Sequence, residues 1–284
     1  MPLRERSEGT PTEGLGNLRR MMPYLMPTRN EAYVLFSQEV DAAPTRALAD
    51  RLNAERSPDR PVTQFHMLLR GLTLVFSEFP RLNRFVVGGR HHDRSGIWLA
   101  FSAKMRMDLD APVFARKMRF SSDESLLEMV DRIYEVLDEG RSGRESASDR
   151  EVHAILRLPG PLRRLVVRVG RWLDAAGLLP EAMIENDPLY ASAFVANLGS
   201  VGLDAAYHHL FEHGTTPVFV TMGRVHRAPY VRDDGSVASR EIFALKYTFD
   251  ERTEDGFYAA RALGRLKVLL EDPSQLQPAA SSSI

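Results

Sequence analysis

The stretch Phe249-Asp250-Glu251-Arg252-Thr253-Glu254-Asp255-Gly256 joins a strand-like run to a helix-like run near the carboxyl end of the chain. Residues 242–249 are mostly apolar or aromatic, which predicts a strand. Residues 257–270 have the spacing of a helix, and Asp255 is a residue type that caps helix N-termini. The simplest interpretation is a strand-to-helix turn in which Asp255 is the N-cap of a helix that begins at Gly256.

Composition excludes several classes of protein. The chain has 284 residues, 44% of them hydrophobic and 26% charged, so it is long enough to bury a large core. Its net charge of −1 is too balanced for a nucleic-acid surface, which must neutralise several phosphates. No apolar run reaches the roughly 20 residues that span a bilayer, and the N-terminus lacks the apolar core of a signal peptide. We therefore expect a cytoplasmic protein, with neither a nucleic acid nor a membrane as its partner.

Cysteine chemistry is excluded because the sequence contains no cysteine. A disulfide, a thiolate metal site and a cysteine nucleophile all require this residue. Candidate chemistry therefore rests on histidine, aspartate and glutamate.

Periodicity predicts alternating helices and strands from Asn17 onward, after a flexible arm over residues 1–16. Expected helices begin near residues 18, 44, 62, 126, 162 and 257, with Thr63 as one N-cap and Ser121 with Glu124 as a capping box. Expected strands cover residues 33–41, 84–87, 97–105, 114–120, 191–196, 217–222, 225–231 and 240–249. Gly88 and Gly89 are expected to turn a hairpin between residues 84–87 and 97–105, residues 139–150 to form a loop, and residues 274–284 a flexible tail.

A basic amphipathic helix is expected after Leu158-Pro159-Gly160-Pro161. Its apolar stripe, Leu162, Leu165, Val166, Val169 and Leu173, lies opposite four arginines, Arg163, Arg164, Arg168 and Arg171. Such a helix suits a membrane surface or a protein partner. We prefer the interpretation in which the Leu162–Leu173 helix packs its stripe within the subunit or its oligomer, but a protein partner stays open.

A cluster of histidines lies in the segment Tyr207–His213. His209 and His213 are four residues apart, so they share one face if the segment is helical, and zinc sites use such spacing. No further ligand stands at a diagnostic distance, so we expect no metal. His208 and His209 are candidates for a substitute catalytic base, and ordinary packing is the preferred interpretation.

Four motifs in chain order resemble those of the dihydrolipoyl acyltransferases, the core subunits of the 2-oxoacid dehydrogenase complexes. They are Arg19-Arg20 in a basic helix, Leu82-Asn83 after Pro80, Asn197-Leu198-Gly199 followed by Val201-Gly202, and the loop Asp250–Gly256. The resemblance covers about residues 17–273, which we expect to form one domain. It implies an α/β two-layer sandwich of a mixed β-sheet covered by helices, like that of chloramphenicol acetyltransferase. Residues 151–190 exceed the family's connection there and are expected to be an added helical segment.

The two catalytic roles of the family fall on unsuitable residues. There, a histidine takes the proton of the thiol of CoA or dihydrolipoamide, and a serine or threonine hydroxyl stabilises the oxyanion. The resemblance places these roles at Glu251 and Ala196. A glutamate is roughly 3 kcal/mol worse than a histidine as a base toward a thiol, from their reference pKa values. The loss of one oxyanion donor costs on the order of 10²–10³ in rate.

The resemblance also implies an assembly and further roles. It implies a homotrimer, or a multiple of trimers, with active sites between subunits. It pairs Asp255 with Arg19 or Arg20 of the basic helix, and it gives structural roles to Asp250, Arg252, Asn197 and Gly199. We expect a catalytically degenerate homologue that acts as an oligomeric scaffold or binding module, requires no cofactor and retains coenzyme A as a possible ligand. The alternative is an active CoA-dependent acyltransferase whose base is Glu251 or a histidine of residues 208–213.

Overall fold

One mixed β-sheet organises the fold of the computed structural model, which describes residues 6–104, 108, 110, 113–141 and 147–277. Its strands follow the order β2-β10-β8-β7-β5-β6, and β9 also pairs with β10. The bounds are β2 Tyr33–Asp41, β5 Ile97–Lys104, β6 Val113–Phe120, β7 Ala193–Asn197, β8 Val218–Met222, β9 His226–Val231 and β10 Val237–Asp250. Strand β7 runs parallel to β5 and β8, and the other pairs are antiparallel.

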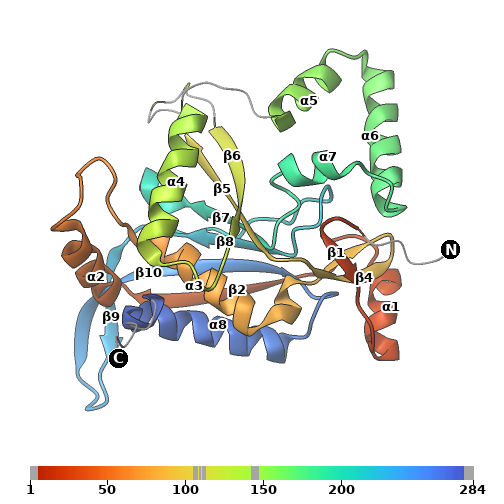
Figure 1. The fold of residues 1–284 in the computed structure, drawn as a ribbon. Coiled ribbons are helices and arrows are strands. Elements are labelled where there is room, and N and C mark those ends of the chain that lie inside the picture. The colour runs from red at the N-terminus through yellow and green to blue at the C-terminus, as the bar shows by residue number, and fades with distance from the viewer. Residues whose placement is uncertain (1–5, 105–107, 109, 111–112, 142–146, 278–284) are drawn as a thin grey trace, which may run out of the picture.

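Helices cover one face of this sheet (Figure 1). They are α2 Ala43–Asn53, α3 Gln64–Glu78, α4 Leu126–Arg141 and α8 Gly256–Glu271. The main core lies between these helices and the sheet, and includes Leu69 of α3, Leu266 of α8, Val195 of β7 and Leu245 of β10. The second face carries a smaller cluster of Ala100, Ala191, Phe194, Leu210 and Phe219. The α/β two-layer sandwich expected from the sequence is confirmed.

The start of α3 shows how local chemistry sets a helix boundary. The Thr63 hydroxyl accepts from the backbone N–H of His66, while His66 Nδ1 accepts from the backbone N–H of Thr63. This reciprocal pair confirms Thr63 as N-cap. The capping box of α4 is formed by Ser125 and Glu128, so its placement at Ser121 and Glu124 is wrong. Both pairs have the same spacing, but only Ser125 stands directly before the apolar face that begins at Leu126.

The amino-terminal residues differ from the expected flexible arm. Strand β1, Gly9–Pro11, pairs with β4, Arg90–Arg94, which pairs in turn with β3, Phe85–Val87. A buried ionic cluster holds this arm: Arg6 contacts Glu8 and Asp174, and Glu8 also contacts Arg94. The cluster joins charges distant in the sequence, so hydrophobic periodicity gives no sign of it.

The expected hairpin has a different second strand. Gly88 and Gly89 form its turn with φ angles of 58° and 73°, as a two-residue hairpin turn requires. The chain then returns as β4 beside β3, whereas β5 pairs with β6 and β7. Strand β4 escaped prediction because Arg90-His91-His92-Asp93-Arg94 contains no apolar residue.

The remaining helices lie outside the main core. Helix α1, Asn17–Leu25, precedes β2 as expected. Helices α5 Ala147–Leu156, α6 Gly160–Ala175 and α7 Glu181–Asn186 form an added segment beside the sheet (Figure 1). Part of the predicted loop 139–150 is therefore helical. At the carboxyl end, a turn at Pro273–Leu276 buries Leu276, and Arg70 donates to its carbonyl, so residues 274–276 are not part of a flexible tail. The rest of the expected tail, residues 278–284, lies outside the described residues.

Helix α6 exposes its apolar stripe. Leu165 is 53% exposed, and Leu162, Val166 and Val169 are exposed as well. This stripe therefore does not pack within its own subunit, and its packing within an oligomer stays a prediction. The helix is instead fixed at its end, where the Asp174 carboxylate accepts from Arg6 at 2.6 Å. None of the described helices is long and apolar enough to cross a membrane.

We predict that His66 makes stability depend on pH. Burial, with a smaller contribution from Arg56, lowers the pKa of His66 from 6.5 to about 4. The stability provided by the neutral ring is therefore present above pH 6.5 and is lost as the pH falls from 6.5 to 4. A glutamine preserves the capping box without titrating. Between pH 7 and pH 4.5, the free energy of unfolding of His66→Gln should fall by about 2 kcal/mol less than that of the wild type.

Chemical denaturation at a series of pH values measures this difference. Parallel curves for the two proteins would show that His66 does not titrate in this range.

Candidate functional site

The loop after β10 is closed by a buried ion pair. Asp250 is 1% exposed, and its two carboxylate oxygens accept from Nε and Nη2 of Arg252 at 2.8 and 2.7 Å. The remaining Nη1 of Arg252 donates to the carbonyls of Met26 and Pro27. Such two-point pairing between guanidinium and carboxylate fixes orientation as well as charge. The loop is therefore held against the connection between α1 and β2.

Glu254 makes the contact expected of Asp255. Its buried carboxylate lies 3.7 Å from Arg19 and 3.3 Å from both Arg81 and Arg84. Asp255 is exposed and accepts from the backbone N–H of Tyr258 at 2.9 Å, as the N-cap of α8. The N-cap interpretation is confirmed, and the pairing of Asp255 with the basic helix is wrong. The longer side chain of Glu254 reaches the arginines, whereas that of Asp255 turns to the helix start.

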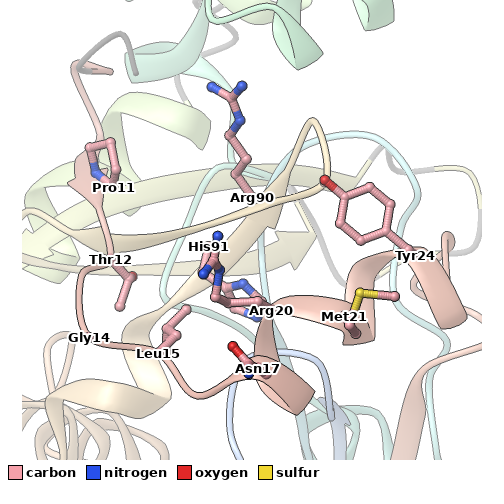
Figure 2. Close-up of a pocket in the computed structure, with 11 residues that line it drawn as sticks. Pro11, Thr12, Gly14, Leu15, Asn17, Arg20, Met21, Tyr24, Arg90 and His91 are labelled. Carbon is pink, nitrogen blue, oxygen red and sulfur yellow. The ribbon is translucent and has the colours of Figure 1, made fainter. Parts of the chain in front are cut away.

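The two arginines of α1 have separate positions. Arg19 donates to the Glu251 carbonyl at 2.6 Å and thus fixes the backbone of the loop. Arg20 is exposed and lines a cavity on the other side of α1 (Figure 2). The expected structural role of Arg20 in pairing with Asp255 is therefore wrong.

Glu251 has a fixed backbone and a partly exposed side chain. Its N–H donates to the Ala32 carbonyl at 2.9 Å, while its own carbonyl accepts from Arg19. Within the described part of the chain, its carboxylate has no hydrogen-bond or ion-pair partner. The carboxylate is thus presented at the end of β10 without an ion-pair partner among the described residues.

The register of the sheet separates Ala196 from Glu251. Ala196 of β7 lies opposite Thr221 of β8, which lies opposite Lys246 of β10. Glu251 is five residues beyond Lys246, which is about 16 Å along the sheet at 3.3 Å per residue. The two side chains therefore cannot contact one thioester within a single subunit. If they share a site, it forms between subunits.

Asn197 and Gly199 shape the turn after β7. The Asn197 side chain accepts from the backbone N–H of Ser200 at 3.1 Å and caps a short 3₁₀ helix, Leu198–Val201. A Cβ at Gly199 would lie 2.7 Å from the Gly223 carbonyl, so only glycine fits there. This turn brings the chain across the end of β8.

The histidine segment is not helical, so the expected shared face of His209 and His213 does not form. His213 instead contacts Asp187 at 2.7 Å, and this hydrogen bond raises its pKa. The described residues contain no group of three or more ligands that could hold a metal ion. His209 is exposed and stacks on the ring of His208 at 4.5 Å.

His208 is the better placed of the two candidate bases. Its ring stacks on Phe219 of β8, with centroids 4.0 Å apart. Its Nδ1 lies 2.7 Å from the His209 carbonyl, which can only accept. In the neutral ring Nδ1 therefore carries the proton, and Nε2 is the basic nitrogen. Phe219 is two residues from Thr221, the neighbour of Ala196, so His208 lies nearer to Ala196 than Glu251 does.

Two residues near the loop escaped sequence analysis. Glu254 was overlooked beside Asp255, although both follow the same strand. His91 of β4 is 5% exposed, and its Nε2 lies 2.8 Å from the Arg252 carbonyl. Its place in a strand without apolar residues gave no signal of this contact.

The fold is that of the acyltransferases related to chloramphenicol acetyltransferase. A solved structure described as chloramphenicol acetyltransferase superimposes with a TM-score of 0.52 and 11% identity, covering 91% of this chain and 96% of that chain. A probable dihydrolipoamide acetyltransferase from Listeria monocytogenes gives a TM-score of 0.61 and 16% identity, covering 96% and 98% of the two chains. The cubic core of a pyruvate dehydrogenase multienzyme complex gives 0.62 and 16%, covering 93% of each.

Residues 186–277 match the family described as 2-oxoacid dehydrogenases acyltransferase, catalytic domain. This match contains both Asn197-Leu198-Gly199 and the loop Asp250–Gly256, whereas Arg19-Arg20 and Leu82-Asn83 lie outside it. The resemblance inferred from the motifs is thereby confirmed.

We predict that Glu254, and not Asp255, stabilises the loop by ion pairing. Glu254→Gln should lower the free energy of unfolding by about 2–3 kcal/mol, because Arg19 and Arg84 then lose a buried counter-charge. The matched change Asp255→Asn should cost less than about 0.5 kcal/mol, since asparagine caps a helix as well as aspartate does. Urea denaturation of both variants measures the difference. An equal or larger cost for Asp255→Asn would contradict this assignment.

Proposed function

We propose that the protein is a catalytically degenerate relative of the dihydrolipoyl acyltransferases that acts as a homo-oligomeric scaffold or binding module. The observation that carries this proposal is the pair Ala196 and Glu251. By resemblance to the family's motifs, these residues stand where the oxyanion donor and the base are expected. Alanine has no hydroxyl to donate, and a carboxylate is a weaker base toward a thiol than an imidazole.

The register supports a site that lies between subunits. Ala196 and Glu251 are about 16 Å apart along the sheet, so only a neighbouring subunit can bring the two positions together. The second face of the sheet has the exposed apolar surface that such contact needs. It includes Tyr33, Leu35, Leu203, Tyr207 and Phe211, each more than a third exposed in the single chain. We infer a homotrimer, or a multiple of trimers, that buries this face.

The exposed stripe of α6 supports a further contact surface. Burial of each large apolar side chain contributes roughly 1.5–3 kcal/mol, so Leu162, Leu165, Val166 and Val169 favour coverage by another surface. In this proposal a neighbouring subunit or a protein partner covers the stripe through the Leu162–Leu173 helix.

Chemistry argues against strong acyl transfer. A developing thiolate would meet the carboxylate of Glu251 in place of an imidazole, and like charges repel. The oxyanion would lack a side-chain donor at Ala196. Coenzyme A is accordingly a possible ligand of the inherited site and not a required cofactor.

One observation favours a second candidate function, an active CoA-dependent acyltransferase. His208 holds Nδ1 against the His209 carbonyl and leaves Nε2 basic, in the way a general base is oriented. It lies on the sheet face that carries Ala196. In this alternative the base is either His208 or Glu251 of the loop after β10.

We predict that the transfer of acetyl groups from acetyl-CoA to dihydrolipoamide is restored by repair of both positions. The rate of acetyl transfer by the double variant Ala196→Ser, Glu251→His should exceed that of the wild type by about 10³-fold or more. This factor combines the gain of an oxyanion donor with the gain of a better base. Glu251→Gln, which removes the carboxylate charge without adding a base, is the matched control. Robust wild-type turnover that Glu251→Gln or His208→Gln abolishes would contradict degeneracy and establish the second candidate.

A further inference from the structure

A cavity of about 660 Å³ lies between β1, α1 and the β3–β4 turn (Figure 2). Cavities of roughly 300–1,000 Å³ commonly hold small molecules. The lining residues are Pro11, Thr12, Gly14, Leu15, Asn17, Arg20, Met21, Tyr24, Gly89, Arg90 and His91. Neither Ala196 nor Glu251 is among them, so the cavity is separate from the inherited acyltransferase positions.

The charge of the cavity wall is positive. Arg20 and Arg90 line it, and no lining residue is acidic. In the described part of the chain neither guanidinium has an ion-pair partner. Figure 2 shows Arg20 beside His91, and the side chain of Arg90 extends away from both. Two cations left without counter-charge in a concave surface favour an anionic ligand.

Helix α1 adds to this positive potential. It begins at Asn17 on the cavity wall, has no side-chain N-cap and has no acidic residue in its first turn. The N–H groups of Asn17, Leu18 and Arg19 donate no hydrogen bond to another described residue, and the helix dipole favours negative charge at this end. Thr12, another lining residue, has a buried hydroxyl that finds no hydrogen-bond partner among the described residues.

His91 connects the cavity to the loop after β10. It is 5% exposed, and burial lowers its pKa, so the ring is neutral near pH 7. Because the Arg252 carbonyl can only accept, Nε2–H donates to it at 2.8 Å, and Nδ1 is left as an acceptor. The buried imidazole thus lines the cavity with its Nε2 occupied by the loop and its Nδ1 left to accept a hydrogen bond.

The rest of the wall is apolar. Leu15, Met21 and Tyr24 line it, and Met21 and Tyr24 are 50% and 66% exposed. Gly89 in the β3–β4 turn lies against the Tyr24 ring, where an added Cβ would be 3.5 Å from it. An aromatic or other flat apolar group fits beside this ring.

We propose that this cavity binds a small organic anion, with its phosphate or carboxylate group at Arg20 and the start of α1 and its apolar part against Met21 and Tyr24. A phosphate and a carboxylate share the oxygen acceptors that a guanidinium recognises. All the lining residues come from one chain, and neither Ala196 nor Glu251 is among them.

Titration calorimetry with three aromatic probes tests the proposal. Phenyl phosphate and phenylacetate carry the two anionic groups, and benzyl alcohol is the neutral counterpart. At least one anion should bind the wild-type protein more tightly than benzyl alcohol. The anion that binds more tightly identifies the natural group as phosphate or carboxylate.

Variants locate the binding. Arg20→Gln should weaken binding of the anion about 10-fold or more, the range for loss of a charged hydrogen bond. Arg51→Gln, a change on the exposed surface of α2, should leave it unchanged. Tyr24→Ala should weaken the binding of phenyl phosphate and that of phenylacetate to a similar degree, because both probes carry the same ring. Thermal melting of each variant checks that it is folded.

The proposal would be overturned if neither anion bound the wild-type protein, or if benzyl alcohol bound as tightly as the anions. It would also be overturned if the anion bound Arg20→Gln as tightly as it binds the wild type. Equal weakening by Arg51→Gln would likewise show nonspecific attraction to positive charge.

Discussion

The register of β10 is the constraint on which the rest of the structure depends. This strand pairs with β2, β8 and β9, so it fixes the level of every residue in the sheet relative to the loop that follows Asp250. The buried Asp250–Arg252 pair then ends the strand and holds the loop against the connection after α1. A one-residue slip would turn the side chains of β10 to the opposite faces of the sheet. The positions of Ala196 and Glu251 at opposite ends follow from this register, and with them the inference that a shared site needs two subunits.

Elements that pack an apolar face could be predicted from the sequence. Strand β2 has the predicted bounds, and α3, α4, α6 and α8 lie where periodicity placed them, because these segments carry the hydrophobic pattern itself. Elements held by polar contacts could not. Strand β4 has no apolar residue, and β1 is fixed by a buried ionic cluster. Residues 203–216 pack on the sheet through Leu210 but form no helix or strand, so they have no periodicity to predict them.

The contacts of the candidate site could not be predicted from the sequence. Motif spacing proposes Glu251, Ala196, Asn197 and Gly199 as site positions, but which acid meets which arginine depends on side-chain length and direction. Glu254 reaches the arginines from inside the loop, while Asp255 caps α8. The basic pair of α1 is divided in the same way: Arg19 is bound to the loop and Arg20 faces a cavity. The sequence shows which side chains are charged, but the path of the folded backbone determines which of them form ion pairs.

A cryo-electron microscopy structure of the purified oligomer tests the central claim most directly. The account predicts a trimeric unit in which Glu251 faces the partner subunit's Ala196 across a channel at the subunit boundary, with the apolar second face of each sheet buried there. A monomeric particle, or an oligomer that leaves Glu251 and Ala196 on separate open surfaces, would contradict it.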